Sequence, residues 1–333
     1  MKRFLRCAEI PRRSHDKRET LRYIQQSQMI SVLLKRFVHG VIVLWAVATL
    51  TFLLLRLAPG GPFDSERKLP PEIIANLEAK YHLNEPVLEQ YVRYLAGLAH
   101  GDFGPSYKYL DRGVTEIIAD TLPTSALLGI LAVLFTMVVS FPLGFFAAYY
   151  RESTIDRLCL FIGTLGISLP NFILGALLIW AVALQLGWLQ AGRWDDWSSV
   201  ILPMVTLGAA PAAYVSALLR SSLIETLGED FVRTARAKGV REHSVLARHA
   251  LRNSLIPILT VMGPLTATLL TGSFVVEYVF AIPGMGRFFI TAVTDRDYPL
   301  IMGVTLVYTA ILVSANFAVD LLYGWVDPRI RTE

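Results

Sequence analysis

Few side chains in this 333-residue sequence stand at spacings that support catalysis. The tripeptide Asp102–Gly104 copies a metal-binding motif of protein kinases, but the glycine-rich loop and the HRD motif that kinase chemistry requires do not occur. Residues Ser14–Asp16 are a serine, a histidine and an aspartate in succession, and neighbouring side chains point apart, whereas a catalytic triad needs convergent ones. The patterns GxxxxGK followed by Ser or Thr, GxSxG and HExxH are missing, and Cys7 and Cys159 lie far apart. We therefore expect no catalytic residue, no cofactor and no metal site.

Two acidic residues stand where long apolar blocks end. Glu277 follows an uncharged block that begins at Ser254, and Asp320 follows one that begins at Pro299. An acid at membrane depth is a candidate functional group by default. The alternative is that both carboxylates lie near the membrane interface, where they are solvated or paired with an arginine or with backbone groups. Both interpretations remain open from the sequence.

A polar loop carries the pattern of a short helix, a glycine and a second helix. The stretch Glu229–Val240 reads EDFVRTARAKGV, and the chain continues through Val245–Asn253 into the next apolar block. Glycine adopts positive φ at low cost, so Gly239 is suited to end the first helix. A short helix with an apolar face suits a groove in a partner protein. The candidate contact residues are Phe231, Arg233, Thr234, Ala235, Ala237 and Gly239.

The elements that must hold this loop are long apolar blocks. Hydrophobic residues make up 54% of the chain, and a helix of about 20 apolar residues crosses a bilayer core of roughly 30 Å. Six blocks reach that length: Phe37–Leu57, Leu122–Tyr150, Leu158–Leu189, Ser199–Leu219, Ser254–Val276 and Pro299–Val319. Prolines within these blocks remove backbone donors and bend helices, which a membrane tolerates where other groups supply the missing contacts. The pattern predicts an all-α polytopic bundle around a pathway.

Charge predicts how the bundle is oriented. Residues 1–36 carry a net charge of +7, residues 58–121 a net −4 and residues 220–253 a net +3. Positive loops stay in the cytoplasm, so six spans with both termini cytoplasmic satisfy all three segments. The basic residues flank apolar blocks, so membrane orientation explains them better than nucleic acid does. The first block is too long for a typical signal peptide, and a poor cleavage site follows it.

The domain organisation follows from these segments. Within the external loop, Pro70 or Pro71 can start one short helix, and Asn84 can cap a second that ends before Gly101. We expect a basic cytoplasmic tail at 1–36, a first span at 37–57, an external loop with short helices at 58–121, a five-helix core at 122–325 containing the cytoplasmic loop 220–253, and a cytoplasmic tail at 326–333.

The polar loop also carries a family resemblance. The stretch Phe231–Gly239, followed by Arg248–Leu251, resembles the coupling loop of permease subunits in ABC importers. Its sequence is most similar to that of the dipeptide and oligopeptide subfamily. Arg233 and Thr234 stand where many members have Glu-Ala, and Asn253 stands where a proline is frequent. The helix-glycine-helix pattern is unaffected by these departures.

The resemblance covers about 300 residues, from Val32 to Arg331. Further matching segments are Leu55–Gly60, His100–Ser106, Gly272–Glu277, Ile282–Gly286 and Asp327–Arg331. Three more look like the B-type subunit of oligopeptide permeases, namely Leu69–Glu72, Glu78–Asn84 and Leu98–Gly101.

The resemblance implies a type I ABC-importer permease in the bacterial inner membrane. It further implies a homologous second permease, two cytoplasmic ATPase subunits that hydrolyse the ATP, a periplasmic peptide-binding protein and a peptide as cargo. Dipeptides, murein peptides or nickel are alternative cargoes within the superfamily. Two other classes of protein are alternatives to a transport subunit: an intramembrane enzyme, and a membrane receptor or scaffold that conducts no substrate.

The first prediction concerns topology. A phosphatase that is active only outside the cytoplasm, fused at Gly97, Trp194 or Asp295, is expected to be active, whereas a fusion at Gly239 is expected to be silent. Enzyme activity per fusion protein in whole cells is the measurement. Activity at Gly239 or silence at Gly97 would contradict the six-span topology.

Overall fold

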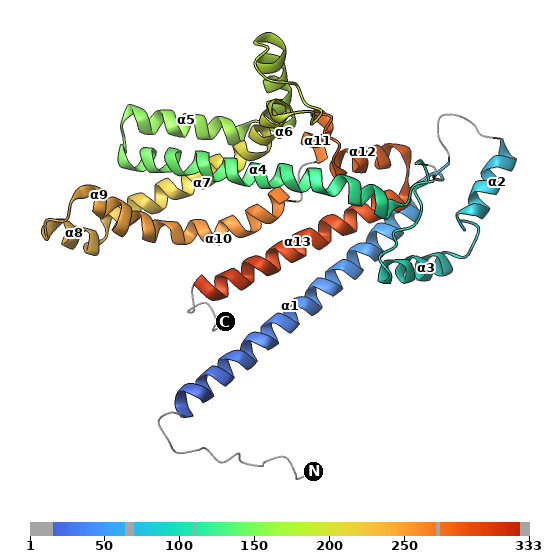
Figure 1. The fold of residues 1–333 in the computed structure, drawn as a ribbon, viewed down its shortest axis with the longest axis horizontal. Coiled ribbons are helices and arrows are strands. Elements are labelled where there is room, and N and C mark those ends of the chain that lie inside the picture. The colour runs from blue at the N-terminus through green and yellow to red at the C-terminus, as the bar shows by residue number, and fades with distance from the viewer. Residues whose placement is uncertain (1–15, 64–69, 110, 271–273, 327–333) are drawn as a thin grey trace. The chain divides into compact units, whose positions relative to one another are not determined.

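The computed structural model describes residues 16–63, 70–109, 111–270 and 274–326, and these residues form helices and connecting turns without a strand (Figure 1). The helices are α1 Asp16–Leu57, α2 Pro71–Lys80, α3 Val87–Ala99, α4 Val114–Tyr149, α5 Thr154–Ser168, α6 Asn171–Leu178, the π-helix η1 Ile179–Gln185, α7 Trp197–Gly228, α8 Asp230–Ala237, α9 Glu242–Ser244, the π-helix η2 Val245–Ala250, α10 Leu251–Leu270, α11 Phe274–Val279, α12 Met285–Asp295 and α13 Tyr298–Val326.

Among the described residues, five helical stretches are long and apolar enough to cross a membrane. They lie in α1, α4, α7, α10 and α13, and the bent pair α5 and α6–η1 makes a sixth if it is counted as one span. The expected all-α bundle is therefore confirmed, with one difference in its third span.

That third span, expected as one block over Leu158–Leu189, is broken. The helices Thr154–Ser168 and Asn171–Gln185 meet at an angle of 108°. Leu169 has an extended backbone with ψ of 121° and Pro170 precedes the first residue of α6. A residue before proline is disfavoured in the helical region, which places the break at Leu169. Six other prolines of the apolar blocks lie inside α4, α7 and α10 without ending these helices.

The first span is the end of a longer helix. α1 begins at Asp16, so part of the expected basic tail is helical and continuous with the apolar block. The chain divides between Ala46 and Val47 into two compact units. The second unit begins at Val47 and contains the last turns of α1 and the helices that follow.

The centre of the second unit is the packing of α4 along α7 (Figure 1). A Cβ atom at Gly144 of α4 would lie 2.6 Å from the carbonyl oxygen of Ser216 and 2.8 Å from Cβ of Leu219. A Cβ atom at Gly208 of α7 would likewise lie 3.0 Å from the carbonyl oxygen of Ala132. Small residues let helix backbones approach closely in membranes, where apolar burial alone gives little association. The two helices therefore meet through glycine.

Helix α3 packs on the last turns of α1. The Phe52 and Tyr91 rings lie 5.3 Å apart, and the Thr49 hydroxyl is 2.6 Å from the Tyr91 hydroxyl. The expected two helices between Pro71 and Ala99 are present, but Pro86 rather than Asn84 precedes α3. Ile73 of α2 is exposed.

The turn before α13 anchors the segment that leads into α4. The buried Asp297 carboxylate accepts a hydrogen bond from the Ser106 hydroxyl and another from the Tyr107 backbone N–H at 3.1 Å. Burial raises the pKa of the Tyr107 phenol to about 12, so this ring stays neutral. The middle of the segment between α3 and α4 is thus held by the turn before α13.

The α4–α7 contact gives a prediction with a matched pair of variants. Gly144→Ala places a methyl group against the Ser216 carbonyl, and overpacking of this kind costs about 1–3 kcal/mol. Gly228→Ala at the end of α7 adds the same methyl group where no atom lies within 4 Å. We expect Gly144→Ala to lower the thermal midpoint of the detergent-solubilised protein and Gly228→Ala to leave it unchanged or raise it. Equal midpoints would contradict the close contact.

Candidate functional site

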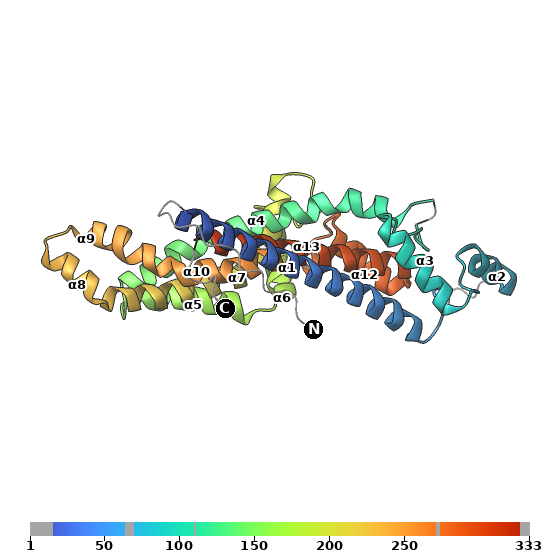
Figure 2. The same cartoon turned by 90° about the horizontal axis from the view of Figure 1, so that it is seen from below.

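The helix-glycine-helix loop lies at one end of the bundle. Helices α8 and α9 project beyond the ends of α7 and α10, whereas α12 lies at the opposite end (Figure 1, Figure 2). Helix α8 follows α7 after one extended residue, Glu229, with φ of −71° and ψ of 149°. Asp230 stands in its first turn and Arg236 in its last, which suits the helix dipole at each end.

Gly239 ends α8 as the sequence predicted. Its φ is +73°, a left-handed conformation that favours glycine. The Gly239 N–H donates to the Arg236 carbonyl at 2.9 Å, and the Val240 N–H donates to the Ala235 carbonyl at 3.2 Å. These two bonds form a Schellman motif, which satisfies carbonyls that the helix end leaves open.

An ion pair closes the loop around this glycine. The Arg236 guanidinium donates to both Glu242 carboxylate oxygens, at 3.2 Å from Nε and 2.7 Å from Nη2. The hydrogen bond from this carboxylate raises the pKa of Arg236 further above its ordinary value. Both side chains are partly exposed, so the pair orients α9 against α8 more than it stabilises the fold.

The candidate contact residues do not share one face. Val232 and Ala235 turn inward and pack with Val245 and Leu227 of the same chain. Ala235, a candidate contact residue from the sequence, is thus buried, and its methyl group fills a contact inside the chain. Phe231 is 42% exposed despite its large apolar ring. The remaining candidates, Arg233, Thr234, Ala237 and Gly239, are exposed as well.

The base of α8 is fixed by bonds between α7 and α10. The Ser254 hydroxyl is 3.0 Å from the Thr226 hydroxyl and 3.3 Å from the Ser222 carbonyl oxygen. Leu223 packs in a buried cluster with Ala148 and Ala250. The last turns of α7 are thus held on two sides immediately before α8 begins.

A partly buried ion pair on the same end of the bundle was missed by sequence reasoning. The Arg220 guanidinium of α7 donates to both carboxylate oxygens of Asp156 at 2.7 Å, from Nε and from Nη2. Asp156 is the third residue of α5, and the Ser153 hydroxyl caps that helix. The Ser-x-x-Asp spacing before an apolar block is a sequence signal for such a helix start. The partner across the bundle has no signal in the sequence.

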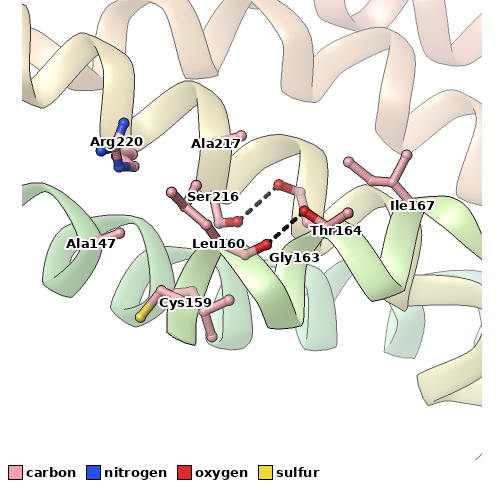
Figure 3. Close-up of a pocket in the computed structure, with 11 residues that line it drawn as sticks. Ala147, Cys159, Leu160, Gly163, Thr164, Ile167, Ser216, Ala217 and Arg220 are labelled. Atoms are coloured by element: carbon pink, nitrogen blue, oxygen red, sulfur yellow. Dashed lines mark hydrogen bonds between the residues drawn. The ribbon is translucent and has the colours of Figure 1, made fainter. Parts of the chain in front are cut away.

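Figure 3 shows Arg220 at one end of a small pocket between α4, α5 and α7. Cys159 and Gly163 line its α5 side, and Ser216 and Ala217 its α7 side. The Ser216 and Thr164 hydroxyls donate to carbonyls of their own helices, each at 2.8 Å. The pocket is narrow and mostly apolar, so it is a packing gap rather than a site with free polar groups.

Glu277 is buried beside the start of α12. Its Oε2 atom accepts a hydrogen bond from the Gly286 backbone N–H at 2.7 Å. A Cβ atom at Gly284 would lie 2.3 Å from the same oxygen, so the glycine leaves room for the carboxylate. Glu277 is thus bonded to backbone and not solvated. The side chain of Asp320 lies outside the described residues.

Metal-ligand clusters of three or more His, Cys, Asp or Glu side chains are not found in the part of the chain that the structure describes. At this end of the bundle, the short helix α8 exposes one aromatic side chain, that of Phe231. The end of α7, from which α8 projects, is held by the contact between Ser254 and Thr226.

Comparison with solved structures identifies the class of fold. A membrane-transporter chain described as the MetNI methionine ABC transporter in inward-facing conformations matches with a TM-score of 0.53, covering 65% of this chain and 97% of that chain at 18% identity. At this identity the likeness concerns the fold alone. The chain shares the fold of this ABC-transporter chain.

Sequence comparison gives the family. The family described as "Binding-protein-dependent transport system inner membrane component" matches residues 140–332, and its N-terminal companion matches residues 29–129. The oligopeptide transport system permease protein OppB of Haemophilus influenzae is 41% identical over 305 residues, covering 91% of this chain and 100% of the relative. The dipeptide transport system permease protein DppB of Bacillus subtilis is 42% identical over 303 residues, covering 91% and 98%. The chain belongs to this family of inner-membrane transport components, which confirms the predicted class of importer permease.

Gly239 gives a prediction that separates backbone from side-chain effects. No atom lies within 4 Å of a Cβ built at this position, so substitution acts through the backbone alone. Gly239→Val should cost about 1–3 kcal/mol of local stability because a β-branched residue is strained at positive φ. Gly239→Asn should cost less, since asparagine tolerates that region.

The measurement is hydrogen exchange of the backbone amides at positions 239 and 240, which donate the two capping bonds. Faster exchange in the valine variant than in the asparagine variant is expected. Identical exchange in the two variants would exclude a role for the left-handed cap.

Proposed function

We propose that this chain forms one half of the passage through which a bacterial ABC importer moves oligopeptides across the inner membrane. The observation that carries the proposal is the identity of 41% to an oligopeptide permease along that relative's whole length. Dipeptides are the second candidate cargo, favoured by the 42% identity to a dipeptide permease. The passage itself is formed with a homologous second permease.

The energy for transport comes from elsewhere in the complex. Two cytoplasmic ATPase subunits hydrolyse ATP, and a periplasmic peptide-binding protein delivers the cargo. Both termini lie in the cytoplasm in this arrangement, as does the loop that contains α8. The net charge of +3 on residues 220–253 supports this orientation.

Helix α8 is the element that docks on an ATPase subunit. Its inward face, Val232 and Ala235, is occupied by the chain itself. Its outward residues, Phe231, Arg233 and Thr234, are free to enter a groove, with Ala237 keeping the far end of the surface small. Phe231 is the expected anchor, because aromatic side chains dominate binding energy when a partner pocket buries them.

The cargo is tested by reconstituting the chain with its second permease, ATPases and binding protein in liposomes. Labelled dipeptides and longer peptides are offered separately, with ATP inside or omitted. ATP-dependent accumulation of the longer peptides is expected. Accumulation of dipeptides alone would assign the second cargo, and accumulation of neither peptide class would contradict the proposed function.

The docking surface is tested at Phe231. Phe231→Asp should weaken co-purification of the ATPase subunits, because loss of an aromatic anchor costs at least about 2 kcal/mol, roughly thirtyfold in affinity. Phe231→Leu keeps an apolar side chain and is the matched control. The exposed ring contributes little to folding, so both variants should reach the membrane in normal amounts. Undiminished co-purification and uptake with Phe231→Asp would show that α8 is not the docking element.

A further inference from the structure

The bidentate pair of Asp156 and Arg220 binds the start of one helix to the side of another. Both Arg220 nitrogens lie 2.7 Å from a carboxylate oxygen, and the Glu152 backbone N–H donates to the same carboxylate at 2.9 Å. Three donors therefore converge on one carboxylate. They join α5, α7 and the turn between α4 and α5 at a single point.

The pair is less exposed to solvent than the pair of Arg236 and Glu242. The Asp156 and Arg220 side chains are 4% and 24% exposed, whereas those of Arg236 and Glu242 are 43% and 49% exposed. Two charges withdrawn from water hold together well only when their geometry is good, and removal of one partner leaves an uncompensated charge. The bidentate contact of Asp156 and Arg220 has good geometry. Besides stabilising the fold, the pair connects α5 to α7.

Arg220 lies on the helix that carries α8. Helix α7 continues without interruption from Arg220 to Gly228, and α8 begins two residues later. The hydroxyl contact between Ser254 and Thr226 holds the intervening turns. Only the extended residue Glu229 separates α8 from α7, so a displacement of α8 reaches Arg220 through one linking residue and the last turns of α7.

Asp156 lies on the helix that leads into the broken span. Helix α5 runs from Thr154 to the break at Leu169, where the chain turns by 108° into α6. Along the way, a Cβ atom at Gly166 would lie 3.0 Å from the Ala209 carbonyl oxygen of α7, so α5 stays close to α7. A force on Asp156 is thus applied to α5, the first helix of the bent pair.

We propose that Asp156 and Arg220 are a positioning pair that transmits movement of α8 to the bent pair α5 and α6–η1, and so couples ATP hydrolysis to peptide movement. This inference rests on the proposed function, in which α8 docks on an ATPase. The pair touches neither peptide nor nucleotide. Its role is to keep α5 and α7 moving as one body.

The test uses the complete transporter in liposomes and measures ATP hydrolysed and peptide accumulated in the same sample. Asp156→Asn and Arg220→Gln each remove one charge, and Arg220→Lys keeps the charge while losing the bidentate contact. The double variant Asp156→Arg with Arg220→Asp restores the pair in reverse. Asp120→Asn, which breaks the exposed contact with Arg112, is the matched control.

Every variant is normalised to the amount of assembled transporter. We expect the single variants to retain their ATPase subunits and to hydrolyse ATP, while the ATP used per peptide rises at least tenfold. The reversed pair should recover part of the wild-type ratio, and Asp120→Asn should match the wild type.

Two results would overturn the inference. One is an unchanged ratio of ATP to peptide in the single variants. The other is a loss of uptake that parallels loss of assembled transporter in every variant, which is what a purely structural pair would give. Failure of the proposed function is distinguishable, because the wild-type transporter would then accumulate no peptide, or Phe231→Asp would keep its ATPases.

Discussion

Helices in a bilayer do not gain from hiding apolar side chains from lipid, so they associate through close contact of their backbones. In this chain the contact lies between Gly144 of α4 and the Ser216 and Leu219 region of α7, where an added methyl group would meet a carbonyl oxygen. Two further elements of the second unit are attached to these two helices. Ser125 of α4 accepts the Met285 N–H at the start of α12, and α7 carries the ion pair with Asp156.

Helix α7 sets the positions of both of its ends. Its start is a capping box, in which Asp196 accepts the Ser199 N–H at 3.1 Å while the Ser199 hydroxyl reaches back to the Asp196 backbone. Its end is held by Ser254 and leads into α8. The presented helix is therefore an extension of the most tightly packed part of the core. That arrangement suits an element whose position must follow the core closely.

Features governed by local rules could be predicted from the sequence. The stop at Gly239, the helix beginning at Pro71 and the positions of the five unbroken apolar helices depend on residues close together in the chain, and the structure has all of them. The break at Leu169 was not predicted, because prolines also lie within α4, α7 and α10 without ending those helices.

Contacts between distant segments could not be read from the sequence. Ala235 has the spacing of an exposed face, but Val245 lies across the loop and covers it. Asp156 and Arg220 are 64 residues apart, and only the packing of α5 on α7 brings them together. Likewise, the surroundings of Glu277 depend on how the chain folds back at Gly284 and Gly286. In each case the deciding partner lies in another element.

The bend between α5 and α6 also restricts where lipid can lie. The end of one helix and the start of the next leave backbone carbonyl and amide groups without partners within their own helix. Such groups are not stable against hydrocarbon tails and require protein or water around them. Wherever the 108° turn at Leu169 and Pro170 lies within the hydrocarbon region, acyl chains are therefore excluded from it. In the assembled complex this corner must be hydrated or covered by protein, even though apolar side chains such as Ile167 and Phe172 flank it.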